Sequence, residues 1–163
     1  MLTEKLHEDL ITAQKAGDTA KVAALRYLLA DVKNREIELR YLQNTGKVPV
    51  GTFQADGNIS DQEVISIIQK QVKQHIESVT AFESGNRADL ANKEATELSI
   101  LEAYLPPQMA RDDIKAEVSL LVGILPEPDQ KNFGLVMRAA MAELKGRADG
   151  SLVQQVVKEV LGV

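Results

Sequence analysis

Apolar residues recur along most of the chain at the three- and four-residue spacing of an amphipathic α-helix. In the N-terminal part this spacing predicts four helices, at about 3–16, 19–43, 61–84 and 87–104. The chain lacks the regular alternation of apolar and polar residues that is typical of half-buried strands. The pattern therefore predicts an all-α protein whose N-terminal part is a bundle of long helices.

Residues at the predicted helix ends favour these boundaries. Thr3 is expected to cap the first helix, Gly17 suits its C-terminus, and Asp18 suits the cap of the next helix. Ser60 precedes the third helix, where its oxygen can accept from the Glu63 backbone N–H while the Glu63 side chain returns to Ser60. These short-range signals predict where the chain enters and leaves each helix.

Each long helix carries an apolar stripe that we expect to be its buried face. The third helix is expected to end at Gly85, because glycine tolerates the left-handed conformation of many helix ends. The stripes are Val22, Leu25, Leu29, Val32 and Leu39 on the second helix, and Ile65, Ile68, Val72, Ile76 and Val79 on the third.

Residues 44–60 interrupt the helical pattern with three glycines and a proline. We interpret this stretch as a long loop, and a short hairpin through Val48 and Phe53 is the alternative. A second break follows at Pro106 and Pro107, because proline lacks the N–H that a helix needs and restricts the residue before it.

The double proline divides the chain into two predicted domains. An N-terminal helical domain is expected at 1–105, and a small three-helix domain at 106–163. The three C-terminal helices are predicted at about 111–124, 133–145 and 150–161.

Composition excludes several classes of function. The 163 residues are 44% hydrophobic and 26% charged, which is ordinary for a globular protein, and the absence of cysteine removes disulfides and thiolate chemistry. The net charge of −5 argues against general polyanion binding, so only a local basic surface could bind nucleic acid. The chain has no apolar run long enough for a membrane span and no signal-peptide pattern, so we expect a cytoplasmic protein with no membrane role.

The sequence offers little for catalysis. It contains no phosphate-binding glycine loop, no dinucleotide fingerprint and no HExxH, so we expect no catalytic residue, no metal site and no cofactor. Glu94 and Glu97 lie one turn apart on the fourth predicted helix and could form a carboxylate site, but a solvated face with Lys93 explains them more simply. His75 is either a surface residue or a proton-transfer group.

A short basic segment joins the last two predicted helices. Gly146 suits a helix C-terminus and Asp149 suits the cap of the final helix, so Lys145 and Arg147 flank a tight turn. Amides at the start of a helix favour anions. The segment therefore predicts contact with phosphates, and the alternative is a capped turn with incidental cations.

Residues 131–158 hold five basic residues and two acidic ones, a net +3 within an acidic chain. This imbalance predicts contacts with an RNA backbone rather than DNA sequence reading. The predicted RNA-binding residues are Lys131, Arg138, Lys145, Gly146, Arg147, Asp149, Gly150 and Lys158, with possible further contacts from Arg26, Lys73 and Arg87.

Several segments together resemble the YqeY-like family, which shares a domain with the tail of the B subunit (GatB) of the glutamine-dependent aminoacyl-tRNA amidotransferase. The resemblance covers nearly the whole chain. Its segments are Leu25-Arg26 through Glu36-Ile37, Gly85-Asn86-Arg87-Ala88-Asp89-Leu90, Tyr104-Leu105-Pro106-Pro107-Gln108, Gly134-Leu135-Val136-Met137 and Lys145-Gly146-Arg147-Ala148-Asp149-Gly150.

The resemblance implies a two-domain helical fold and a GatB-tail-like C-terminal domain that engages tRNA. The resemblance implies that the family's function is described as carbon–nitrogen ligase activity with glutamine as the amido donor. The sequence of this chain, however, contains neither a glutaminase site nor a nucleotide-binding site. We therefore expect a non-catalytic accessory protein that binds tRNA or a related structured RNA. A helical protein-interaction module and a component of an amidotransferase complex, with amidotransferase or synthetase partners, are the alternatives. The long second and third helices could also pair between chains.

Overall fold

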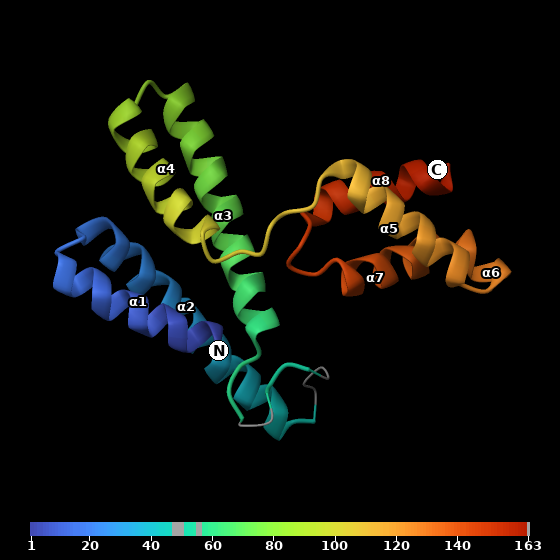
Figure 1. Ribbon diagram of the computed structural model, residues 1–163, viewed down its shortest axis with the longest axis horizontal. Helices are drawn as coiled ribbons and strands as arrows, with labels where there is room; N and C mark the ends of the chain where they lie inside the picture. Colours follow the sequence, from blue (N-terminus) through green and yellow to red (C-terminus); the bar gives the residue numbers. More distant parts are fainter. Residues whose placement is uncertain (47–50, 55–56, 163) are drawn as a thin grey trace. The chain divides into compact units, whose positions relative to one another are not determined.

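The computed structural model describes residues 1–46, 51–54 and 57–162 (Figure 1). Every regular element in these ranges is a helix, and their strand pairing is limited to an isolated bridge between Phe53 and Ile59. The all-α prediction is confirmed. The chain divides into two compact units, Met1–Leu105 and Pro106–Val163, each with its own core.

The first unit contains four helices: α1 (Leu2–Ala16), α2 (Thr19–Asn44), α3 (Asp61–Ser84) and α4 (Ala88–Glu102). The pairs α1–α2 and α3–α4 are antiparallel hairpins, and α2 also packs against α3 and α4 (Figure 1). The buried faces of these helices meet in one core. Its members are Leu6, Leu25, Leu28, Val32, Leu39, Ile59, Val64, Ile68, Leu101 and Tyr104.

Three predicted helix ends are confirmed. Gly17 closes α1 in the left-handed conformation with φ 72°. The Asp18 carboxylate accepts from the Lys21 backbone N–H at 3.0 Å and caps α2. Ser60 Oγ accepts from the Glu63 backbone N–H at 3.3 Å and caps α3.

One predicted end is wrong, and another has the predicted position but not the predicted backbone conformation. Met1, not Thr3, occupies the N-cap of α1, because helical geometry already begins at Leu2. Gly85 follows α3 with φ −85°, and Asn86 takes the left-handed conformation with φ 55°. Asparagine tolerates this conformation better than most residues, so α3 ends before Gly85 as predicted while the left-handed residue is the next one along.

The buried face of α3 is rotated from the predicted stripe. Val64, Ile68 and Gln71 are buried, whereas Ile76 is 47% exposed. The polar Gln71 enters the interior because its Nε2 donates to Asp31 of α2 at 2.8 Å. A purely apolar pattern therefore misassigned this face by about one residue.

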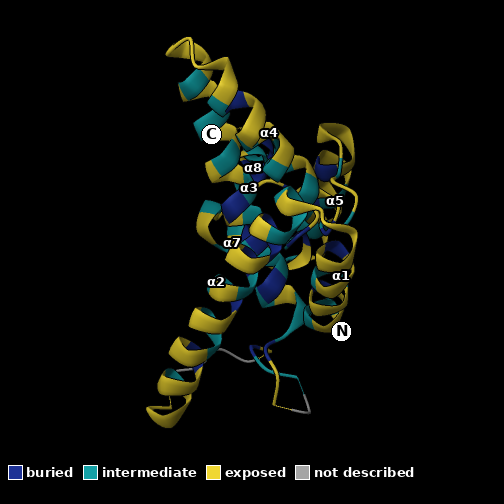
Figure 2. Cartoon of the chain, turned by 90° about the vertical axis from the view of Figure 1, so that its left-hand side faces the viewer, coloured by how far each residue is buried: buried dark blue, intermediate teal, exposed yellow. Residues whose placement is uncertain are grey.

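Part of the segment between α2 and α3 belongs to the core. Ile59 is 3% exposed, and Thr52 is equally buried. Arg40 of α2 donates to the Gly57 carbonyl at 3.2 Å, which fastens the segment to one side of the helix. Val48, part of the predicted hairpin alternative, lies outside the described residues. In Figure 2 the second half of α2 is otherwise exposed over most of its surface.

The second unit contains α5 (Arg111–Ile124), α6 (Glu127–Gln130), α7 (Phe133–Glu143) and α8 (Gly150–Leu161). The short α6 was not predicted. Pro126 is its N-cap, with a carbonyl that accepts from the backbone N–H groups of Asp129 and Gln130, and Pro128 lies within its first turn. Proline at the start of a helix is favourable, so the residues that suggested a break form one helical turn.

Helices α5, α7 and α8 pack against one another around an aliphatic core. No helix in the described residues combines the length and apolar character that crossing a membrane requires. The core members are Ile114, Val118, Val136, Ala140, Leu144, Ala148, Val153, Val156 and Val157.

Candidate nucleic-acid interface

The basic segment between α7 and α8 forms a tight turn. Gly146 has φ 83°, a conformation that favours glycine. The Leu144 carbonyl accepts from the backbone N–H groups of Arg147 at 3.0 Å and Ala148 at 3.2 Å. Leu144 and Ala148 are buried, so the turn is anchored in the core at both ends.

The approach to α5 also holds this turn. The Met109 backbone N–H donates to the Arg147 carbonyl at 2.8 Å. Gln108 Nε2 donates to the Gly146 carbonyl at 3.1 Å. These bonds fix the backbone of the turn, which carries the side chains of Lys145 and Arg147. Lys145 is partly buried and Arg147 is exposed.

Asp149 caps α8 as predicted. Its Oδ1 accepts from the backbone N–H groups of Ser151 at 2.8 Å and Leu152 at 3.1 Å. A side chain of the protein thus already occupies these amides, which were expected to favour an external anion. Gly150 lies against Met141, whose Cε would be 3.3 Å from an added Cβ. Asp149 and Gly150 therefore build the turn, and phosphate contacts would fall to the cations.

Four of the five predicted cations of the second unit form two groups, and Arg138 lies between them. Lys145 and Arg147 lie at one end of the antiparallel α7–α8 pair (Figure 1). Lys131 precedes α7 and Lys158 lies in the last turn of α8, so both lie toward the other end. The 11 residues of α7 span about 16 Å. Arg138 is exposed in the middle of α7.

Two further cations escaped the sequence reasoning. Arg111 and Lys115 of α5 both bind the Glu159 carboxylate of α8, at 2.7 and 2.6 Å. They lower the pKa of Glu159 below its ordinary value, mainly through the hydrogen bond from Lys115. Their one-turn spacing on α5 is a signal in the sequence, but both residues lie before the basic stretch 131–158.

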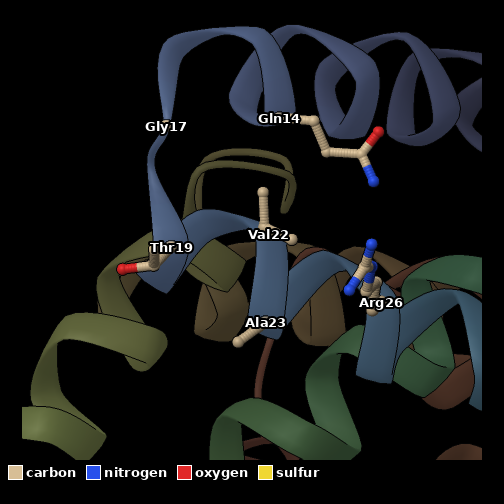
Figure 3. A pocket seen from close by; sticks show the side chains of 6 residues that line it. All are labelled: Gln14, Gly17, Thr19, Val22, Ala23 and Arg26. Atoms are coloured by element: carbon tan, nitrogen blue, oxygen red, sulfur yellow. The ribbon is translucent and has the colours of Figure 1, made fainter.

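The three candidates in the first unit do not share one environment. Arg87 binds Asp89 through two hydrogen bonds, at 3.0 and 2.9 Å, and Asp89 keeps the pKa of that guanidinium above its ordinary value. Lys73 is exposed on α3 and makes no ion pair with a described residue. Arg26 lines an open pocket of about 380 Å³ between α1 and α2, where its side chain and that of Gln14 point toward each other (Figure 3).

The carboxylates considered for catalysis are engaged within the α3–α4 hairpin. Glu94 Oε2 lies 2.7 Å from His75 Nδ1, with both side chains mostly buried. Glu97 lies 4.0 Å from the Lys93 ammonium, with Lys93 70% exposed but Glu97 only 19% exposed, so the expected solvated face holds for the lysine alone. His75 joins α3 to α4 rather than lying on the open surface.

Comparison with known proteins places these features in a family. The sequence model described as Yqey-like protein matches residues 3–161. Altered inheritance of mitochondria protein 41 of Pyrenophora tritici-repentis is 30% identical, over 97% of this chain and 80% of that protein. Its namesake in Kluyveromyces lactis is 27% identical, over 76% of this chain and 60% of that protein.

A more distant relative belongs to an amidotransferase. It is a subunit of the glutamyl-tRNA(Gln) amidotransferase of Methanobrevibacter smithii, 23% identical over 97% of this chain, which corresponds to 23% of that protein. The expected cytoplasmic location is contradicted, because the fungal relatives are named as mitochondrial proteins. The archaeal match identifies an amidotransferase-related domain, and the chain belongs to the YqeY-like family.

Proposed function

We propose that this protein is an accessory module that binds tRNA or a similarly structured RNA through the cations of its second unit, without catalysis of its own. The observation that carries the proposal is the set of exposed cations there. Arg147, Arg138, Lys131 and Lys158 make no ion pair with any residue in the described ranges. The relationship to a tRNA-dependent amidotransferase supplies the class of RNA.

The spacing of the two cation groups suits a ligand whose phosphates extend over several nucleotides. Lys145 and Arg147 are separated from the Lys131 end by about one length of α7, roughly 16 Å. Adjacent phosphates of one strand are much closer than this, since they advance about 3.4 Å along a helix axis. The two groups would thus contact different parts of the backbone, and the absence of tryptophan argues against base stacking as the main contact.

The test measures tRNA affinity by fluorescence anisotropy at several salt concentrations. We expect Lys145→Glu/Arg147→Glu to weaken binding about 10-fold or more at low salt and to reduce the salt slope by about two. The matched control is Lys15→Glu/Lys70→Glu, which makes the same charge change at exposed positions of the first unit. Equal loss in both variants would show that only net charge matters and would overturn the assigned surface.

A helical protein-interaction module is the second candidate, and one observation favours it. Leu120 is 64% exposed and Ile124 is 81% exposed, one turn apart on α5. An amidotransferase or a synthetase is the partner class that the family relationship suggests. Affinity capture after RNase treatment, repeated with Leu120→Lys/Ile124→Lys, separates the two functions. Protein capture that this variant abolishes, without measurable tRNA binding by the wild type, would favour the second candidate.

Direct amide transfer is the weakest of the alternatives. Pure protein incubated with glutamine, ATP and Glu-tRNA(Gln) is expected to release no ammonia and to form no Gln-tRNA. Product that forms only when both this protein and amidotransferase subunits are present would identify the protein as a component of that complex.

A further inference from the structure

The outward face of α2 carries a second apolar stripe that the fold does not use. Its residues follow alternating three- and four-residue steps, which is the heptad spacing of a coiled-coil seam. All five are exposed, with Tyr27 at 60%, Ile37 at 58% and Tyr41 at 70%. The stripe, which we call the α2 seam, consists of Tyr27, Ala30, Asn34, Ile37 and Tyr41.

Charges of opposite sign flank the two sides of the α2 seam. Arg26, Lys33 and Arg40 occupy the positions before Tyr27, Asn34 and Tyr41. Asp31 and Glu38 occupy the positions after Ala30 and Ile37. These are the heptad positions that form ion pairs between coiled-coil helices and determine their orientation.

This charge order selects one arrangement of two α2 helices. In a parallel, in-register pair, a residue on the basic side meets the acidic residue five positions later on the second copy. Arg26 would then meet Asp31, and Lys33 would meet Glu38. An antiparallel pair would instead bring basic sides together and acidic sides together, which is unfavourable.

Asn34 favours the same arrangement. It occupies the central position of the α2 seam, where a polar asparagine in a coiled coil fixes the register, because its amide pairs with the same residue of the other helix. The adjacent groove between α2 and α3, about 410 Å³, is lined by Asp31, Asn34 and Glu38 among others. Arg35 and Lys70 line the same groove, so basic side chains of the chain itself share it with these carboxylates.

We propose that two copies of this chain associate through a parallel, in-register pairing of their α2 helices. The intrachain bonds on these flanks allow exchange: Lys33 binds Glu36 at 3.0 Å with Lys33 66% exposed, and Glu38 binds Arg35 at 2.8 Å with Glu38 59% exposed. Such exposed ion pairs contribute little. Because the seam spans only about two heptads, the dimer is expected to dissociate in the micromolar range.

Sedimentation velocity of the full chain at increasing concentration tests the association. The wild type should shift from monomer to dimer between micromolar and millimolar concentration. Ile37→Lys/Tyr41→Lys should remain monomeric with unchanged helix content, whereas Ile11→Lys, at a similarly exposed apolar position on α1, should dimerise normally. A wild type that stays monomeric throughout, or a seam variant that dimerises equally well, overturns the proposal.

Charge exchange tests the predicted pairs directly. Lys33→Glu and Glu38→Lys should each weaken the dimer several-fold, and the double variant should recover most of the affinity because the pair is restored with reversed polarity. Failure of the double variant to recover would contradict the pairing of Lys33 with Glu38.

Because the chain has no cysteine, disulfide formation tests orientation without background. Tyr27→Cys and Tyr41→Cys should each form a homodimeric disulfide efficiently, and Ile11→Cys should not. Efficient cross-linking only in a mixture of the Tyr27→Cys and Tyr41→Cys proteins would demonstrate an antiparallel pair and overturn the proposed arrangement.

Discussion

The two units of this protein bury different kinds of side chain. The first unit places Gln71 at 2% exposure, and its Tyr104 hydroxyl donates to Asp9 at 2.6 Å. Among the described residues, the core of the second unit is entirely aliphatic, and its ion pairs lie on the surface. The core of the first unit thus combines apolar packing with directional polar contacts, while the buried core of the second unit consists of aliphatic side chains.

In the second unit, the residues that stabilise the fold are therefore different from the charged residues that could bind a partner. A buried hydrogen bond requires a particular arrangement of the segments that it joins, so these contacts help to specify how α3 meets α2 and how the residues after α4 meet α1. Apolar packing is less directional, which leaves the charged residues of the second unit at its periphery. Those exposed cations can be changed without disturbing the core, which suits a surface that binds a charged partner.

The largest expected effect comes from the aliphatic core. Leu144 is 1% exposed at the start of the basic turn, and Leu144→Ala should lower the free energy of unfolding of the second unit by about 3 kcal/mol through lost burial and a cavity. Amide hydrogen exchange should show reduced protection in α5, α7 and α8 and unchanged protection in α3. Leu28→Ala should give the converse pattern. Equal loss of protection in both units would show that they unfold as one.

Tyr104 gives the next effect, in the polar part of the first core. Burial and the hydrogen bond to Asp9 raise the pKa of the Tyr104 phenol far above its ordinary value of 10. Since the folded protein retains this proton where the unfolded chain loses it, the stabilisation is complete below pH 10 and declines as the pH rises above 10. Tyr104→Phe should cost about 1–2 kcal/mol at pH 7 and should remove this part of the alkaline decline.

Urea unfolding of wild type and Tyr104→Phe at pH 7 and pH 10.5 provides the measurement. Tyr41→Phe serves as the control, because Tyr41 is 70% exposed and should affect neither value. An alkaline decline that is the same in Tyr104→Phe as in the wild type would assign it to other groups.

Gln71 should give a smaller effect of opposite sign. Its Nε2 binds Asp31, but its buried Oε1 has no hydrogen-bond partner among the described residues. Gln71→Met keeps the size of the side chain and removes the unpaired oxygen, while Asp31 is exposed enough to bind water. We expect stabilisation by about 1 kcal/mol in urea unfolding. A loss of similar size would show that the bond to Asp31 outweighs the unpaired oxygen.

The helices and their short-range caps were accessible from sequence because they depend on local spacing. Gly17, Asp18 and Ser60 act within one helical turn of their own positions. The face of α3 was not accessible, because Gln71 becomes a core residue only when Asp31, 40 positions earlier, is brought beside it. The hydrophobicity of the residues along α3 cannot predict that a polar side chain is buried because of a hydrogen bond to a distant part of the chain.

The candidate site shows the same limit. The sequence predicted the turn around Gly146 and the cap by Asp149. It did not show that Asp149 already binds the first amides of α8, which were expected to bind an external anion. The packing of α5, α7 and α8 determines where the two cation groups lie. It also brings Arg111 and Lys115 into ion pairs with Glu159. A count of charges in a window cannot distinguish free cations from bound ones.

The smallest expected effect on stability is also the sharpest test of the peripheral charges. Glu159→Gln removes the carboxylate that binds Arg111 and Lys115. Because all three side chains are well exposed, the midpoint of urea unfolding should barely change. If the second unit binds RNA, the two released cations should raise tRNA affinity several-fold at low salt, and the gain should shrink as salt screens it. Glu143→Gln, an equal charge change at an exposed residue of α7, is the matched control. A similar gain from both variants would trace the effect to net charge, whereas a gain confined to Glu159→Gln would extend the RNA surface onto α5.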